Sequence, residues 1–110
     1  MKVTRLSDAK AYDAELHYKM EALRLQGLEA SPADSFSVGL SYFLPGGGAE
    51  MSGSSNEKVY VLLEGEVTVI TEDGETTLGP LDSCYIGLNE KRAVENRSNQ
   101  VATMLVIVSS

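Results

Sequence analysis

Four side chains combine charge or titration with a spacing that suits a reactive site. Lys58 and Tyr60 stand two residues apart in an apolar segment, Arg92 lies in another short segment, and His17 is the only histidine. A guanidinium can bind a carboxylate through paired hydrogen bonds, and an ammonium adds a point charge. Proton transfer near neutral pH needs His17, or a Lys58 whose pKa is lowered by burial. These residues predict a site for a small anion, with or without proton-transfer chemistry.

The composition restricts the class of protein. A chain of 110 residues suits one domain, and its net charge of −7 argues against binding to nucleic acid or to anionic lipid. The N-terminal stretch lacks the apolar run of a signal peptide, and no segment approaches the ~20 apolar residues that cross a bilayer. The expected compartment is therefore the cytoplasm. Cys84 is the only cysteine, which excludes an internal disulfide and a multi-cysteine zinc site.

The segments around these residues have the patterns of short β-strands. Alternation over 36–44 predicts a half-buried strand whose apolar face carries Leu40 and Tyr42. Asp73 and Gly74 lie between alternating runs and predict a hairpin with a type I′ turn. The other expected strands, bounded by turn residues, are 59–63, 67–71, 75–78, 83–86, 93–96 and 103–108. This spacing, with almost no helix, indicates an all-β sandwich or small barrel.

The N-terminal third has a less regular pattern. Residues 2–6 alternate and predict a short edge strand. Over 8–26, helical spacing of apolar residues competes with strand-like alternation near its end. A turn cluster at 31–35 would let a strand at about 21–28 pair with the strand at 36–44, so a hairpin is preferred to a long helix. We therefore expect an N-terminal strand or arm over 1–35 and a barrel core over 36–108, in a single domain of residues 1–110.

Two ordered motifs resemble those of the cupin superfamily, which are small double-sheet jelly-roll barrels. The first cupin motif reads Gly, five residues, His-x-His, three or four residues, Glu, six residues, Gly. Gly46 and Gly65 match its ends, and between them lies an apparent glycine-rich loop that feeds a hairpin. The second motif opens like residues 78–86, and Asn96 matches its end. The resemblance covers 36–108 and implies an all-β double-stranded β-helix, or jelly-roll barrel.

The sequence departs from both motifs at the metal ligands. The residues at the His, His, Glu and second His positions are Ser52 and Ser54 (or Met51 and Gly53 with the longer spacing), Lys58 and Arg92. Metal centres of this family need neutral imidazoles and a carboxylate, whereas two fixed cations repel a divalent ion. The resemblance therefore implies a cupin without metal at the usual site and without another cofactor. A weaker alternative is an unusual metal site that uses Glu50, Glu57 and His17.

The resemblance also implies which side chains face the interior of the barrel. Alternation places Lys58 and Tyr60 on one face of their strand, and that face becomes the wall of an apolar cup. The expected catalytic residues are Lys58, Tyr60 and His17, and the expected ligand-binding residues are Arg92, Tyr42, Cys84 and Arg24. The expected partner is a small anion, either a carboxylate or a keto acid.

Four of the candidates also have a purely structural interpretation. Lys58 could instead form an ion pair with Glu57, Glu50 or Glu90, and Arg92 could form one with Glu95 at the surface. Cys84 could be a small buried hydrophobe, and His17 could be a surface residue.

Two classes of function remain open from the sequence. One is a metal-independent isomerase, cyclase or lyase, in which Arg92 holds a carboxylate, Tyr60 or His17 moves a proton and Lys58 stabilises an enolate. The other is a non-catalytic ligand-binding or sensing module. A His17 far from Arg92 would count against the enzyme. Both faces of the strand at 59–63 are apolar and cupins usually pair through their sheets, so a homodimer is expected.

Overall fold

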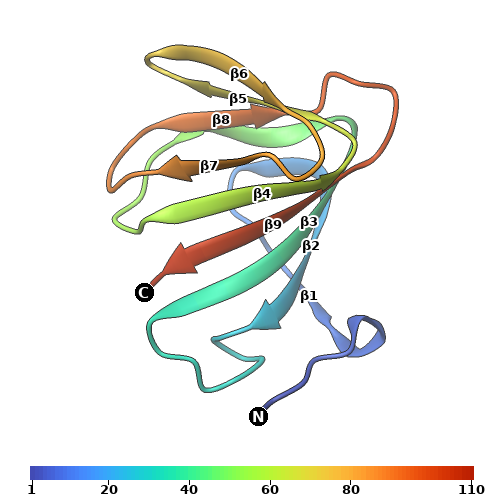
Figure 1. Cartoon of the computed structure of the whole chain (residues 1–110), viewed down its shortest axis with the longest axis vertical. Helices are drawn as coiled ribbons and strands as arrows, with labels where there is room; N and C mark the ends of the chain where they lie inside the picture. The colour runs from blue at the N-terminus through green and yellow to red at the C-terminus, as the bar shows by residue number, and fades with distance from the viewer.

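The computed structural model describes all of residues 1–110, and almost all of its regular structure is β-strand. A short 3-10 helix, Leu6–Asp8, precedes nine strands. These are β1 Lys10–Tyr12, β2 His17–Gln26, β3 Phe36–Ser52, β4 Lys58–Glu64, β5 Val67–Thr71, β6 Gly74–Leu78, β7 Ser83–Ile86, β8 Arg92–Glu95 and β9 Ala102–Ser109. Figure 1 shows β5 and β6 at one end of the molecule and β1 with the N-terminus at the other. The all-β prediction is confirmed.

The long strand β3 joins the two halves of the barrel. Its first part pairs with β9, from Phe36 opposite Ser109 onward, and its last part pairs with β8, up to Ser52 opposite Arg92. The antiparallel order is β6-β5-β8-β3-β9-β4-β7, and β2 lies along β3 with β1 at its edge. Two sheets that share one strand in this way form the nearly closed jelly-roll barrel.

The glycine-rich segment is strand, and the expectation of a loop there is wrong. A Cβ on Gly47 would lie 2.1 Å from the carbonyl oxygen of Lys19 in β2, and one on Gly48 would lie 2.0 Å from that of Val94 in β8. Both distances are far inside van der Waals contact. The glycines therefore act through close backbone approach, which lets β2 and β8 pack against β3, and they provide no flexible connection.

The expected strands after residue 58 are confirmed to within one or two residues, and those at 67–71 and 83–86 are unchanged. The strand predicted at 2–6 is absent. The expected hairpin between the segment ending near residue 26 and β3 is confirmed, although β2 begins earlier than predicted, at His17. The segment before residue 36 thus supplies a strand of the barrel as well as an arm.

The β5–β6 hairpin is confirmed, but its turn differs from the prediction. Thr71 lies opposite Gly74, so Glu72 and Asp73 are the central residues of the turn. Neither has a positive φ angle, whereas Gly74 has a φ of 125°. The type I′ assignment is therefore wrong, because that turn needs positive φ at both central positions.

The two faces of β3 are reversed relative to the prediction. Ser37, Ser41 and Phe43 point into the barrel, and Leu40 and Tyr42 lie on the opposite face. The hydrophobic core between the sheets is formed by Phe43 with the fully buried side chains of Leu62 and Met104 and their neighbours. The inner face of β3 is thus lined mostly by small residues, and this leaves space beside the core.

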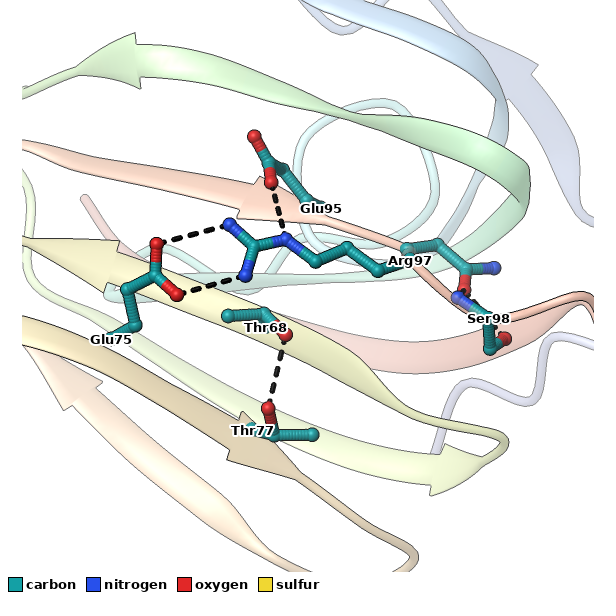
Figure 2. A network of polar contacts seen from close by, with 7 residues as sticks. Thr68, Glu75, Thr77, Glu95, Arg97 and Ser98 are labelled. Carbon is teal, nitrogen blue, oxygen red and sulfur yellow. Dashed lines mark hydrogen bonds and ion pairs between the residues drawn. The ribbon is translucent and has the colours of Figure 1, made fainter.

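Polar contacts hold the outer sheet together at the β8–β9 connection (Figure 2). The guanidinium of Arg97 donates two hydrogen bonds to Glu75 in β6, at 2.8 and 3.0 Å, and one to Glu95 in β8, at 2.7 Å. Thr68 and Thr77 form a hydrogen bond across β5 and β6 at 3.0 Å. The Arg97 contacts are exposed, so they bridge neighbouring strands locally and contribute little to the stability of the fold.

The chain has no helix with the length and apolar character needed to cross a bilayer.

Candidate functional site

A cavity of about 340 Å³ opens into the barrel between the two sheets. This volume is near the lower end of the range of about 300–1,000 Å³ for small-molecule sites. Strands β2, β3, β4, β8 and β9 contribute its walls, and the β1–β2 loop contributes to its rim. Lys58, Tyr60, Arg92 and His17 all line it. The structure thus brings together, in one cavity, the four residues with which the sequence predicts a reactive site.

Arg92 lies at the floor of this cavity and is only 6% exposed. Its Nε donates a hydrogen bond to the Tyr60 hydroxyl at 2.6 Å, and its Nη1 donates to Ser52 Oγ at 3.1 Å and to the Glu50 carbonyl oxygen at 3.2 Å. Every one of these acceptors is uncharged. The alternative of a surface pair between Arg92 and Glu95 is wrong, because Arg92 is buried and Glu95 pairs with Arg97. The guanidinium is therefore fixed in orientation and has no counter-ion.

Lys58 is the second cation of the cavity. Its ammonium donates a hydrogen bond to Ser54 Oγ and forms no ion pair, so the alternative pairings with Glu50, Glu57 and Glu90 are wrong. Burial, and then the charge of Arg92, lower the pKa of Lys58. Burial raises the pKa of Tyr60, against the opposing effect of Arg92. Both shifts favour the neutral form of the side chain. The lowered pKa brings Lys58 closer to proton transfer near neutral pH, whereas the raised pKa keeps Tyr60 protonated as a hydrogen-bond donor.

His17 opens β2 at the wall of the same cavity. Its Nδ1 lies 2.6 Å from the carbonyl oxygen of Glu15, and its ring stacks on Phe43 with the centroids 6.5 Å apart. Since only an N–H can bond to a carbonyl, Nδ1 carries the proton of the neutral ring and Nε2 is left as the acceptor. Burial is the main cause that lowers the pKa of His17, and Arg92 and Lys58 lower it further. His17 is therefore a cavity residue close to both cations.

The β1–β2 loop contributes residues to the cavity that sequence reasoning missed. Tyr12 lines it from the end of β1, and Asp13 and Glu15 line it from the loop itself, where both carboxylates are exposed. The guanidinium of Arg24 lies 3.7 Å above the ring of Tyr12, and its Nε is 3.2 Å from a Glu29 oxygen. Arg24 thus stands in the wall, already paired, between this cavity and a second one of about 330 Å³ beside the N-terminal arm. Residues 13–16 have no periodic pattern, so nothing in their sequence indicates that this loop folds over the barrel.

Two of the expected ligand-binding residues lie outside the cavity lining. Tyr42 is on the outer face of β3, because the inner positions are those of Ser41 and Phe43. Cys84 pairs with Tyr60 across β4 and β7 and packs against the core, where burial raises the pKa of its thiol. For Cys84 this placement fits the structural interpretation of a small buried hydrophobe.

The four positions that carry metal ligands in the motifs meet in space as two hydrogen-bonded pairs. Ser52 accepts from Arg92, to which it lies opposite in the β3–β8 register, and Ser54 accepts from Lys58. Two hydroxyls and two cations do not fit a divalent ion. Nowhere in the chain do three or more His, Cys, Asp or Glu side chains form a group that could hold one. The unusual site built from Glu50, Glu57 and His17 is therefore wrong.

Comparison with known proteins decides the family. A sequence profile described as "Cupin domain" matches residues 39–108. The chain is a cupin. A protein of Mycobacterium tuberculosis named β-D-galactosidase is 44% identical to it over 109 residues, which are 99% of this chain and 94% of that protein. The cupin resemblance seen in the motifs is confirmed.

Solved structures show the same fold. The polyketide cyclase RemF of Streptomyces resistomycificus superposes with a TM-score of 0.87 at 20% identity, covering 99% of this cupin and 79% of that chain. A sugar phosphate isomerase of the cupin superfamily from Silicibacter pomeroyi gives a TM-score of 0.76 at 21% identity, covering 93% of this cupin and 68% of that chain. At these identities the likeness establishes the jelly-roll barrel and nothing finer.

Proposed function

We propose that this cupin binds a small anionic molecule, a carboxylate or keto acid, in the barrel cavity without a metal ion. The observation that carries the proposal is Arg92, which is 6% exposed and bonded only to neutral acceptors. A buried charge without a partner costs several kcal/mol, by order of magnitude. Lys58, beside it, is also unpaired. An anion that enters the cavity supplies the missing charge to both.

The same arrangement supports proton-transfer chemistry on such a ligand. Arg92 would hold the carboxylate, and His17 Nε2 would remove a proton from the carbon next to a carbonyl group. Lys58 or the Tyr60 hydroxyl would donate a hydrogen bond to the enolate oxygen, and His17 would return the proton to another carbon. This sequence describes a metal-independent isomerase, and a cyclase or lyase would share its first step. Binding without turnover is the non-catalytic alternative.

Ligand binding can be tested by calorimetry and thermal shift with pyruvate, 2-oxoglutarate and related keto acids. A ligand at 100 times its Kd should stabilise the protein by about 2.7 kcal/mol. Arg92→Met should weaken binding by about 10- to 100-fold, because a charge-assisted hydrogen bond is lost. Arg97→Met is the matched control, since Arg97 is an exposed arginine in the β8–β9 connection, away from the cavity lining. Unchanged binding in Arg92→Met would contradict the proposal.

Turnover separates the enzyme from the binding module. Exchange of the carbon-bound hydrogen of a bound keto acid with deuterated water, followed by NMR, reports proton abstraction directly. His17→Gln should abolish the exchange and keep the binding. A protein that binds the ligand and shows no exchange above buffer would be the sensing or storage module.

Glycoside hydrolysis is a second candidate, favoured by the 44% identity to the protein named β-D-galactosidase. Most glycosidases use two carboxyl groups beside the scissile bond, and Asp13 and Glu15 are the carboxylates in the cavity lining. The test is hydrolysis of 4-nitrophenyl β-D-galactoside by the purified protein. Asp13→Asn together with Glu15→Gln should then lower kcat/KM by at least about 100-fold. Absence of hydrolysis by the unaltered protein would remove this candidate.

A further inference from the structure

The cavity has two ends of opposite charge that do not neutralise each other. Lys58 and the buried Arg92 lie on the barrel side, whereas Asp13 and Glu15 lie on the exposed β1–β2 loop. None of the ion pairs in the chain joins a cation of the first group to a carboxylate of the second. No nitrogen of Lys58 or Arg92 therefore lies within 4.0 Å of a carboxylate oxygen of Asp13 or Glu15.

Hydrogen bonds to neutral groups hold the cationic end in place. Ser54 orients Lys58, while Tyr60, Ser52 and a backbone carbonyl orient Arg92. Of the three guanidinium nitrogens, Nε and Nη1 bond to the chain, and Nη2 has no acceptor in it. Since Nη2 carries two N–H groups, it can donate to a ligand without breaking any existing contact.

We propose that the ligand is a polyhydroxylated carboxylate of the sugar-acid type, bound in a fixed orientation. This inference rests on the proposed anion binding. The carboxylate of the ligand would take the hydrogen bonds of Arg92 Nη2 and Lys58 Nζ. Its hydroxyl groups would donate to Asp13 and Glu15, since an ionised carboxylate is only an acceptor. Each end of the cavity then meets the complementary end of one molecule.

Other small anions fit this cavity less well. An alkyl carboxylate satisfies the cations but brings no donor to Asp13 and Glu15. An α-amino acid has its ammonium on the carbon next to the carboxylate, where Lys58 and Arg92 would repel it. A sugar acid carries donors along its whole length, and its C–H face can pack on the apolar wall that includes Val106 and Met104. The cations, the apolar wall and the carboxylates of the cavity therefore all match one class of ligand, the sugar acids.

The test compares four probes by calorimetry: D-galacturonate, D-galactose, cyclohexanecarboxylate and 6-aminohexanoate. Galacturonate should bind at least about tenfold more tightly than each of the others, because only it offers a carboxylate together with several hydroxyl groups. The double variant Asp13→Ala/Glu15→Ala should lose about tenfold in affinity for galacturonate and bind cyclohexanecarboxylate at least as well as before. Glu72→Ala/Asp73→Ala on the exposed β5–β6 turn is the control with the same change of charge, and it should alter neither affinity.

The outcomes separate this inference from the function on which it rests. Equal affinity for galacturonate and cyclohexanecarboxylate, both lost in Arg92→Met, would overturn the sugar-acid inference and leave anion binding in place. Tighter binding of 6-aminohexanoate than of galacturonate would indicate that Asp13 and Glu15 bind an ammonium group and not hydroxyl groups. This result would also overturn the sugar-acid inference. If galactose binds as well as galacturonate, or if no carboxylate binds, the anion site itself fails and the inference fails with it.

Discussion

His17 reports on the charge of the cavity, because it is the only histidine in the chain and its ring lies beside the two cations. Burial, Arg92 and Lys58 lower its pKa, while the carbonyl group of Glu15 acts in the opposite direction. Arg92→Met and Lys58→Met should each raise this pKa. The measurement is a carbon-13 NMR titration of the single imidazole. Lys91→Met, at an exposed position, should leave the pKa unchanged; a shift as large as that of Arg92→Met would refute the coupling.

The same pKa predicts how stability changes with pH. Because the pKa of His17 is lower in the folded protein than the usual 6.5, the unfolded chain binds more protons between the two values. The contribution of His17 is complete above about pH 6.5 and is lost as the pH falls toward the folded-state pKa. Between pH 7.5 and 5.5, the unaltered protein should therefore lose more stability in denaturant melts than His17→Gln. Parallel losses would contradict this prediction.

At the scale of elements, β3 depends on glycine where two other strands approach its backbone. A methyl group on Gly47 would meet the carbonyl oxygen of Lys19 at 2.1 Å. Gly47→Ala should destabilise the fold by about 2 kcal/mol or more, since backbone cannot move aside as a flexible side chain does. Gly79→Ala is the control, because its Cβ would meet nothing closer than the Asp82 carboxylate at 3.6 Å. Equal melting temperatures for the two variants would show that β2 and β3 can separate at this point.

β3 also shows which part of the fold its sequence could specify. Alternation over 36–44 identified a strand with two different faces but not which face is inside, because apolar residues occur on the outer face as well. The inner face has small residues for a physical reason. A Cβ on Gly39 would lie 2.5 Å from the Tyr12 hydroxyl, and Ser37 and Ser41 line the cavity. The small residues on this face leave space for Tyr12 and for the cavity. The alternation of residues along β3 does not reveal that such space is needed.

The candidate site was predictable to the extent that it follows strand spacing. Lys58 and Tyr60 share a face by alternation, and the motif spacing relates them to Arg92 in another strand. The contribution of Asp13 and Glu15 depends on how an irregular loop folds over the barrel, which is a tertiary effect. The prediction that Tyr42 binds the ligand was wrong because it assigned the wrong face of β3 to the interior of the barrel.

At the scale of the whole molecule, the outer face of the sheet around β9 carries apolar residues in rows. Val59, Ile107 and Val38 are neighbours in register across three strands, and Leu105 continues this half-buried surface along β9. Tyr85 and Phe36 at its border are 59% and 47% exposed. On a protein of net charge −7, such an uncharged patch is where two copies can meet without repulsion. We propose that this face pairs with a second copy of the chain.

Light scattering coupled to size-exclusion chromatography tests this pairing. The protein should elute with twice the mass of one chain, and Ile107→Glu should shift it to the monomer, because a buried carboxylate in the contact costs more than the contact yields. Thr76→Glu, on an exposed position of β6, should remain dimeric. A monomeric mass for the unaltered protein would refute the proposal, and a dimer that persists in Ile107→Glu would move the contact to another face.

The position of β9 between β3 and β4 has a consequence for synthesis on the ribosome. β3 and β4 are made first, yet each pairs along β9, with Phe36 opposite Ser109 and Lys58 opposite Val108. Until β9 has left the ribosome, β3 and β4 each present an unpaired edge, and unpaired strand edges favour aggregation. The barrel can therefore close only after β9 has been made, and the two edges stay exposed on the nascent chain until β9 is inserted between them.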